Sequence, residues 1–105
     1  MGQGMPRITT QTLRLLGAFT ASESNELSGA EIAKRTKLQS GTLYPILARL
    51  EEAKWLESTW EAGDPRELGR PRRRLYQLTG LGEMNARTAY REIYKSIGGL
   101  TWENS

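Results

Sequence analysis

The chain has 105 residues, no cysteine, no histidine and a net charge of +3 at pH 7. This length predicts a single domain, and the missing cysteines exclude a disulfide framework and agree with a reducing cytoplasm. Without histidine or cysteine the commonest general base and thiol nucleophile are missing, so we expect no enzyme, no metal site and no cofactor. No apolar run approaches about 18 residues, so the sequence predicts no membrane span.

The chain begins with a stretch rich in glycine and proline, residues 1–8, which we interpret as a flexible lead-in. Thr9 or Thr10 can cap a first helix that runs to about Thr20. Leu15 gives this helix a second apolar side, so something besides its own core has to cover it. Residues 21–26 are typical of a polar loop.

Two short helices follow. Ser28 and Glu31 have the spacing of a capping box and predict a helix that ends near Thr36. The next helix is expected to begin with Ser40, whose side chain can cap it, and to end near Ala53. Two helices with about three residues between them indicate a helix-turn-helix.

The next segment predicts a β-hairpin and a long helix. Residues 55–61 and 72–78 favour strands, and the glycine- and proline-rich stretch 62–71 has to turn. Thr79 is expected to cap a last helix from Leu81 to about Ile97, stopped by Gly98 and Gly99. Its apolar residues alternate four- and three-residue steps, the spacing of a coiled-coil seam.

These elements predict an α+β, mostly α fold: a winged helix-turn-helix of three helices and a two-stranded wing, plus one long C-terminal dimerisation helix. We divide the chain into a lead-in at 1–8, a DNA-binding domain at 9–78, and a C-terminal helix with a short tail at 79–105.

Charge is distributed unevenly. Residues 34–74 hold ten basic and six acidic residues, and the rest holds five and six. A nucleic-acid surface is often laid out in this way. The predicted helix at 40–49 also has an outward face without charge except for Arg49, where a solvated helix would carry Glu and Lys. We interpret this face as reserved for DNA.

Small residues at the start of that helix let the backbone approach the major groove, and arginines of the wing can follow phosphates or enter a narrow minor groove. Tyr44 has an alternative as a core residue, and the arginine run has one as a solvated hairpin that discourages edge pairing. The candidate DNA-binding residues are Lys37, Gln39, Ser40, Gly41, Thr42, Tyr44, Arg49, Arg70, Arg72, Arg73 and Arg74.

Three separated stretches, at 29–35, 40–51 and 69–82, carry a family resemblance. The second contains Gly-Thr-Leu-Tyr-Pro, and the third contains Gly-Arg-Pro and Tyr-Gln-Leu-Thr. Together they resemble the PadR family of bacterial transcriptional regulators, over about residues 9–97, in its short subgroup with a single C-terminal helix. The chain departs from the family at Ala30, where an aromatic residue is frequent, and at Ala53–Lys54, where a glycine is frequent.

The resemblance implies a cytoplasmic, sequence-specific regulator of double-stranded DNA, usually a repressor, whose first and last helices build a two-fold homodimer. A two-fold dimer predicts a palindromic operator with half-sites about one helical turn apart. The alternative is a last helix that folds back on its own core in a monomer. The expected dimer interface consists of Leu13, Leu16, Ala86, Tyr90, Ile93, Ile97 and Leu100.

Some members of the family bind drug-like or phenolic molecules near the dimer interface and then release DNA. The resemblance therefore implies a candidate pocket for a small aromatic effector, with ordinary interface packing as the alternative. A winged helix that serves only as a protein-interaction module is the alternative function. The candidate pocket residues are Leu15, Phe19, Tyr90, Tyr94 and Trp102.

Overall fold

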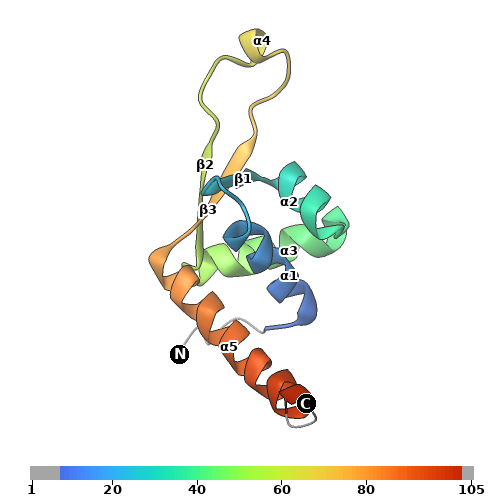
Figure 1. The fold of residues 1–105 in the computed structure, drawn as a ribbon. Coiled ribbons are helices and arrows are strands. Elements are labelled where there is room, and N and C mark those ends of the chain that lie inside the picture. The colour runs from blue at the N-terminus through green and yellow to red at the C-terminus, as the bar shows by residue number, and fades with distance from the viewer. Residues whose placement is uncertain (1–7, 103–105) are drawn as a thin grey trace.

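The computed structural model describes the backbone of residues 8–102 and the side chains of residues 8–97. Three helices pack beside a small sheet, a long hairpin projects from one end, and the last helix extends from the other (Figure 1). This confirms the predicted mostly helical α+β fold. The elements are α1 (Thr10–Thr20), β1 (Glu26–Ser28), α2 (Gly29–Thr36), α3 (Ser40–Glu52), β2 (Leu56–Trp60), α4 (Pro65–Leu68), β3 (Arg74–Leu78) and α5 (Gly80–Trp102).

Local hydrogen bonds explain where α2 and α3 begin. The capping box is present, because the Ser28 N–H donates to the Glu31 carboxylate at 2.8 Å and the Glu31 N–H donates to the Ser28 hydroxyl at 3.1 Å. The prediction that Ser40 caps α3 is wrong. Gln39 is the N-cap and makes no side-chain cap bond, and Ser40 is the first helical residue. The Ser40 side chain is therefore not committed to capping.

The turn between α2 and α3 depends on a left-handed residue and a buried threonine. Lys37 has a φ of 64° and ends α2. The Thr36 hydroxyl donates to the Ile32 carbonyl at 2.7 Å and accepts from the Leu38 N–H at 3.2 Å. From α1, Arg14 donates to the Thr36 carbonyl at 3.4 Å. These contacts fix the angle at which α3 leaves the turn.

The sheet has three antiparallel strands in the order β1-β3-β2, where the sequence predicted only the two strands of the wing. The added strand places Leu27 opposite Tyr76, and Leu27 is 1% exposed. A strand of three residues directly before a helix cap has no periodicity of its own, so the sequence pattern did not reveal it.

The core lies between α1, α2, α3 and the sheet. α1 is covered on both apolar sides by its own chain, since Leu15 and Leu16 are both 0% exposed. The second apolar side of α1 therefore needs no cover from another molecule. The large side chains with less than 2% exposure also include Leu27, Ile32, Leu43, Leu47, Leu50 and Leu56.

The start of α5 is joined tightly to the sheet. The Thr79 hydroxyl accepts from the Gly82 N–H at 2.9 Å and donates to the Lys54 carbonyl at 2.6 Å. The prediction that Gly98 and Gly99 end the helix is wrong, because α5 continues to Trp102. A glycine ends a helix by adopting positive φ, and in the described chain only Gly63 and Gly69 among the glycines do so.

Candidate nucleic-acid interface

The outward face of α3 is uncharged and uncovered over most of its length. Leu43, Ile46, Leu47 and Leu50 are buried, so the opposite side of the helix faces outward. No atom lies within 4 Å of a Cβ built on Gly41, which shows that nothing in the chain itself requires a glycine there. The exposed residues of this face are Ser40, Gly41, Tyr44, Pro45, Ala48 and, at its C-terminal end, Arg49 and Glu52.

The structure brings the predicted residues of the helix-turn-helix together. Lys37 and Gln39, in the turn, and Arg49 are exposed, and Thr42 is half-buried. With Ser40, Gly41 and Tyr44 they form one surface at the turn and along α3, which we call the α3 face.

Tyr44 is not a core residue, because it is 46% exposed. Its hydroxyl lies against Gly29 at the start of α2, so closely that a Cβ at that position would collide with it. Tyr44 also lines a small hollow of about 180 Å³ together with Arg73 and Arg74. The α3 face and the base of the wing therefore meet at this hollow.

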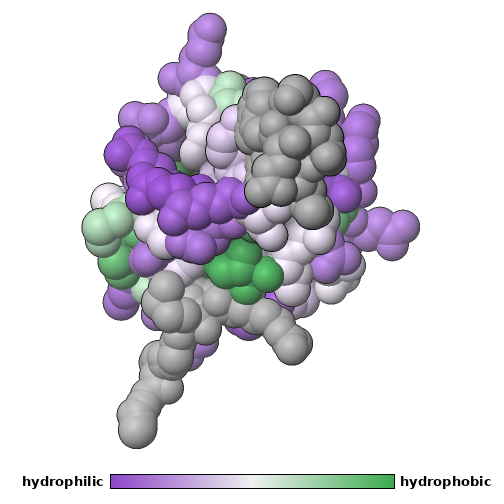
Figure 2. Space-filling model, turned by 60° about the horizontal axis from the view of Figure 1, so that its bottom comes forward, coloured by the Kyte–Doolittle hydropathy of each residue, from purple (hydrophilic) through white to green (hydrophobic). Residues whose placement is uncertain are grey.

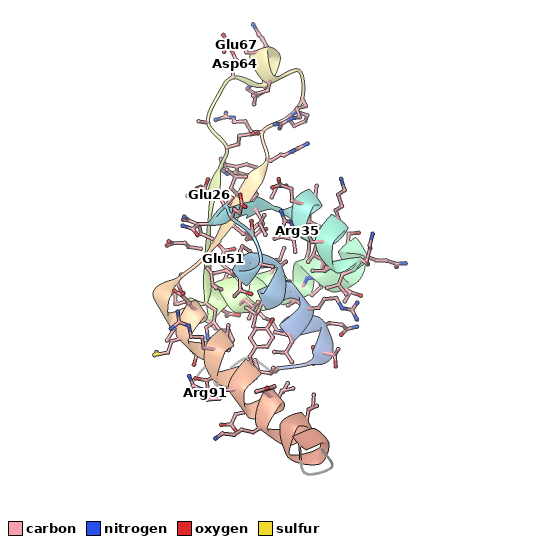
Figure 3. The ribbon with its side chains drawn as sticks, viewed as in Figure 1. Glu26, Arg35, Glu51, Asp64, Glu67 and Arg91 are labelled. Carbon is pink, nitrogen blue, oxygen red and sulfur yellow. The ribbon has the colours of Figure 1, made fainter. Side chains whose placement is uncertain are left out.

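The tip of the wing is formed by the short helix α4 and its two capping residues. Asp64 caps the single turn of α4 by accepting from the Arg66 N–H at 3.0 Å, and Gly69 ends it with a φ of 74°. Asp64 and Glu67 lie at this far end (Figure 3). The tip thus carries acidic side chains, and the wing arginines other than Arg66 follow it at residues 70–74.

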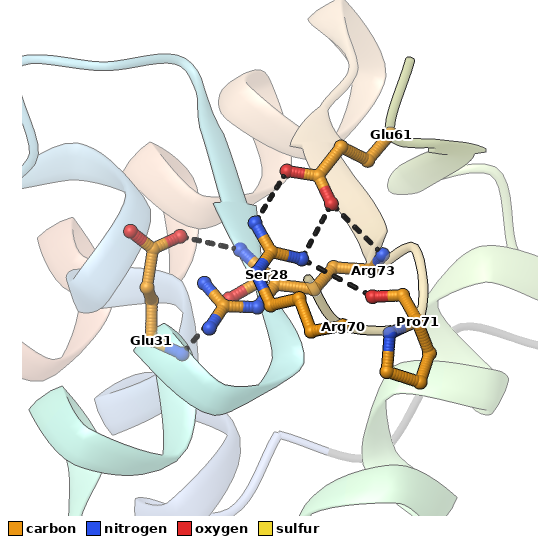
Figure 4. A network of polar contacts seen from close by, with 6 residues as sticks. All are labelled: Ser28, Glu31, Glu61, Arg70, Pro71 and Arg73. Atoms are coloured by element: carbon orange, nitrogen blue, oxygen red, sulfur yellow. Dashed lines mark hydrogen bonds and ion pairs between the residues drawn. The ribbon is translucent and has the colours of Figure 1, made fainter. Parts of the chain in front are cut away.

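Arg70 is paired within the wing. Its guanidinium donates to both carboxylate oxygens of Glu61, at 2.7 and 2.9 Å (Figure 4). The same carboxylate accepts from the backbone N–H of Arg73 at 3.1 Å. The hydrogen bonds from Arg70 and then from Arg73 lower the pKa of Glu61 from 4.5 to about 2, and the bond to Glu61 raises the pKa of Arg70.

Arg74 is also engaged internally. Its Nε donates to the Ser58 hydroxyl at 2.9 Å, and its guanidinium lies over the Trp60 ring, 5.0 Å from the centroid. It also approaches Glu51 of α3 at 3.9 Å. Arg74 therefore braces the base of the wing against α3.

Arg72 and Arg73 differ from these two arginines. Both side chains are exposed, and within the described part of the chain neither guanidinium donates a hydrogen bond or lies in a salt bridge, although the charge of Arg73 also acts on the Glu61 carboxylate. The four predicted arginines thus divide into an internal pair, Arg70 and Arg74, and an outward pair, Arg72 and Arg73. Sequence reasoning missed Glu61, whose only signal was an acidic side chain at the end of the predicted strand 55–61 in an arginine-rich hairpin.

A larger cavity of about 780 Å³ lies between α1, β3 and α5. Three predicted pocket residues, Phe19, Tyr90 and Tyr94, line it, together with polar residues that the sequence did not indicate, such as Arg91 (Figure 3). Leu15 was assigned to this pocket wrongly, because it is 0% exposed and belongs to the core. The side chain of Trp102 lies outside the described residues.

Tyr90 joins α5 to α1. Its hydroxyl donates to the Leu13 carbonyl at 2.8 Å and lies directly over Gly17, and burial raises its pKa. The middle of α5 is therefore attached to α1 of its own chain, although Tyr90 is still 37% exposed.

The expected dimer seam is only partly available to a second molecule. Leu16 and Ala86 are 0% and 1% exposed in the single chain, so the expectation that they form an interface is corrected: their own core covers them. Leu13 is half-buried, Ile93 and Ile97 are 38% and 56% exposed, and the Leu100 side chain lies outside the described residues. Hydrophobic surface lies between hydrophilic side chains on the face seen in Figure 2.

The described part of the chain offers neither a membrane-spanning helix nor a metal-binding cluster. Among the described residues, no helix is long and apolar enough to cross a membrane. In the same part of the chain, no group of three or more acidic side chains is placed to hold a metal ion.

A helix-turn-helix with an open α3 face beside an arginine-bearing hairpin defines the winged-helix class of DNA-binding proteins. Residues 20–88 match the family model "Transcriptional regulator PadR-like family", so the chain belongs to this family. It is a DNA-binding transcriptional regulator and not an enzyme. No curated protein matches the sequence.

Solved structures agree with this assignment. A PadR family regulator from a hypervirulent Clostridium difficile has a TM-score of 0.66 and 25% identity, covering 87% of this chain and 95% of that one. A mutant of Escherichia coli MarR has a TM-score of 0.75 and 19% identity, covering 93% and 66%. Bordetella bronchiseptica BpsR, whose DNA binding is regulated by 6-hydroxynicotinic acid, has a TM-score of 0.66 and 19% identity, covering 90% and 65%. The chain spans less than two thirds of MarR and BpsR, and these two show the fold alone.

Proposed function

We propose that this protein is a bacterial cytoplasmic repressor that binds a palindromic operator as a homodimer and is released by a small aromatic effector. The observation that supports this most strongly is the open α3 face. A helix surface of Ser40, Gly41 and Tyr44, with no atom near the Gly41 Cβ position, has the shape and the hydrogen-bonding groups that a major groove accepts.

In the proposed complex the N-terminal half of α3 enters the major groove. Ser40 and Thr42 bond base edges or phosphates, and Gly41 allows the backbone to approach. Lys37 and Arg49 contact phosphates on either side, which positions the helix without reading sequence. The outward pair, Arg72 and Arg73, contacts the phosphates or narrow minor groove beside it. A site that overlaps a promoter would then block transcription.

The specificity test is selection of genomic DNA fragments by the purified protein at physiological salt. We expect enrichment of one palindromic motif with half-sites roughly one helical turn apart. Enrichment that disappears at this salt would leave only non-specific phosphate attraction and would contradict the proposal.

The homodimer is supported by the exposed part of α5. Tyr90, Ile93 and Ile97 follow one side of the helix at four- and three-residue steps and are 37–56% exposed. A large apolar stripe on a small domain is usually covered by a partner. Size-exclusion chromatography with light scattering is expected to give the dimer mass, and a monomer mass at micromolar concentration would contradict it.

The effector is supported by the cavity of about 780 Å³, where Phe19, Tyr90 and Tyr94 offer aromatic surface and Arg91 offers a cation. Such a site suits a flat molecule with an acidic group, and BpsR shares the fold and responds to an aromatic acid. Titration with phenolic acids and with flat aromatic cations is expected to change the tryptophan fluorescence and to weaken DNA binding. No response to either class would contradict an effector role.

A further inference from the structure

We propose that Glu61 is a positioning residue for DNA binding, which clamps Arg70 and the backbone of Arg73 so that Arg72 and Arg73 are presented to the DNA. Arg70 and Arg74 are then parts of the wing and not ligands of the DNA. The inference rests on the proposed binding of DNA through the α3 face and the wing.

The clamp begins where the ladder between β2 and β3 ends. Trp60 and Arg74 are the last paired residues of the two strands. One step further, the Glu61 N–H still donates to the Arg73 carbonyl at 2.8 Å, but the Arg73 N–H donates to the Glu61 carboxylate and not to a backbone carbonyl. A side chain thus completes the backbone pairing at this step.

Arg70 holds the carboxylate in place. The two parallel bonds from its guanidinium to Glu61 have the fork geometry that fixes both groups in orientation as well as distance. Its Nη1 also donates to the Pro71 carbonyl at 3.2 Å. The chain from Arg70 to Arg73 is therefore tied to one carboxylate at both of its ends, and Arg72 lies between the two ties.

The clamp lies close to the α3 face. Arg73 borders the same hollow as Tyr44, and Arg74, its neighbour, is braced against Ser58 and Glu51. A duplex seated on the α3 face therefore meets the outward pair at the base of the wing, before the acidic tip at Asp64 and Glu67.

The charge of Glu61 makes the proposal testable by the sign of an effect. A carboxylate near DNA repels phosphates, so its neutralisation should strengthen binding if charge alone mattered. If the clamp matters more, the same neutralisation releases residues 70–73. Arg72 and Arg73 then lose their fixed position, and DNA binding weakens.

The experiment compares Glu61→Gln with Glu67→Gln in the full chain. Both variants remove one negative charge from the wing, but the exposed Glu67 side chain makes no clamp. Binding to a labelled duplex of roughly 30 base pairs is measured by fluorescence anisotropy from about 50 to 200 mM salt. Circular dichroism checks that each variant is folded.

We expect Glu61→Gln to weaken binding about tenfold and to reduce the salt slope by about one, as for the loss of one positioned phosphate contact. Glu67→Gln is expected to bind as the wild type does or more tightly. Glu61→Gln that binds as tightly as the wild type, or more tightly, would overturn the clamp. A wild type that binds no duplex would instead overturn the proposed function.

A second set of variants tests whether Arg70 acts through Glu61. If it does, Arg70→Gln and the double variant with Glu61→Gln weaken binding about as much as Glu61→Gln alone, since all three open the same clamp. If Arg70 itself contacts a phosphate, Arg70→Gln weakens binding while Glu61→Gln strengthens it, and the double variant lies between them. That pattern would overturn the proposal.

Discussion

The α3 face and the joint between the sheet and α5 both contain glycine, for opposite reasons. A Cβ on Gly41 would meet nothing within 4 Å, whereas a Cβ on Gly82 would collide with the carbonyl of Trp55. Position 82 requires a glycine because the backbone of the same chain leaves no room for a side chain there. At position 41 the chain itself leaves room for a side chain, yet the residue is still glycine. The comparison distinguishes a glycine that the packing of the fold requires, at the joint, from a glycine that we attribute to the approach of a partner, on the α3 face.

The largest expected effect is on the joint. Gly82→Ala should lower the free energy of unfolding by about 3 kcal/mol, the upper part of the range for overpacking, because the backbone of Trp55 has to move. Gly80→Ala is the matched control, since nothing lies within 4 Å of its Cβ position. Urea unfolding measures both variants, and equal stabilities would show that the joint is not tight.

The next largest expected effect is on DNA binding and comes from the outward pair, Arg72 and Arg73. Changing Arg72 and Arg73 together to Gln should weaken DNA binding by one to two orders of magnitude, roughly, and lower the salt slope by about two, with unchanged stability. Arg66→Gln, at the wing tip, controls for loss of charge alone. A double variant that keeps the wild-type salt slope would contradict phosphate contact.

Thr79→Ala tests the joint more gently. The substitution removes the hydroxyl that accepts from the Gly82 N–H and donates to the Lys54 carbonyl, and loss of such a cap costs about 1 kcal/mol. Thermal unfolding should show a lower Tm, while DNA affinity measured well below the Tm should not change. An unchanged Tm would mean that the cap adds nothing.

The smallest effect concerns the pH dependence of the wing. Because the pKa of Glu61 falls from 4.5 to about 2 on folding, its carboxylate contributes its full stabilisation above pH 4.5 and loses it as the pH falls through 2. The Arg73 amide resonance in NMR should therefore titrate near pH 2 and stay constant from pH 5 to 8. Titration near pH 4.5 would show that the clamp is open in solution.

The features that the sequence predicted correctly are local. The capping box of Ser28 and Glu31 and the apolar stripe of α3 follow from spacing within one or two turns. The third strand and the Glu61 clamp join residues far apart in the chain, and no periodicity marks such pairs. Helical spacing places Leu16 and Ala86 on the apolar faces of their helices. It does not show whether the core of the same chain or a second molecule covers these faces.

The α3 face is tested most directly by Gly41→Ala, with folding and binding measured on the same sample. Alanine is the better helix former, so unfolding should become harder by up to about 1 kcal/mol. DNA binding should weaken at least about tenfold, or ~1.4 kcal/mol, because the new methyl group lies where the groove approaches the backbone. A variant that is equally stable or more stable and binds DNA as the wild type does would contradict the assignment of this surface.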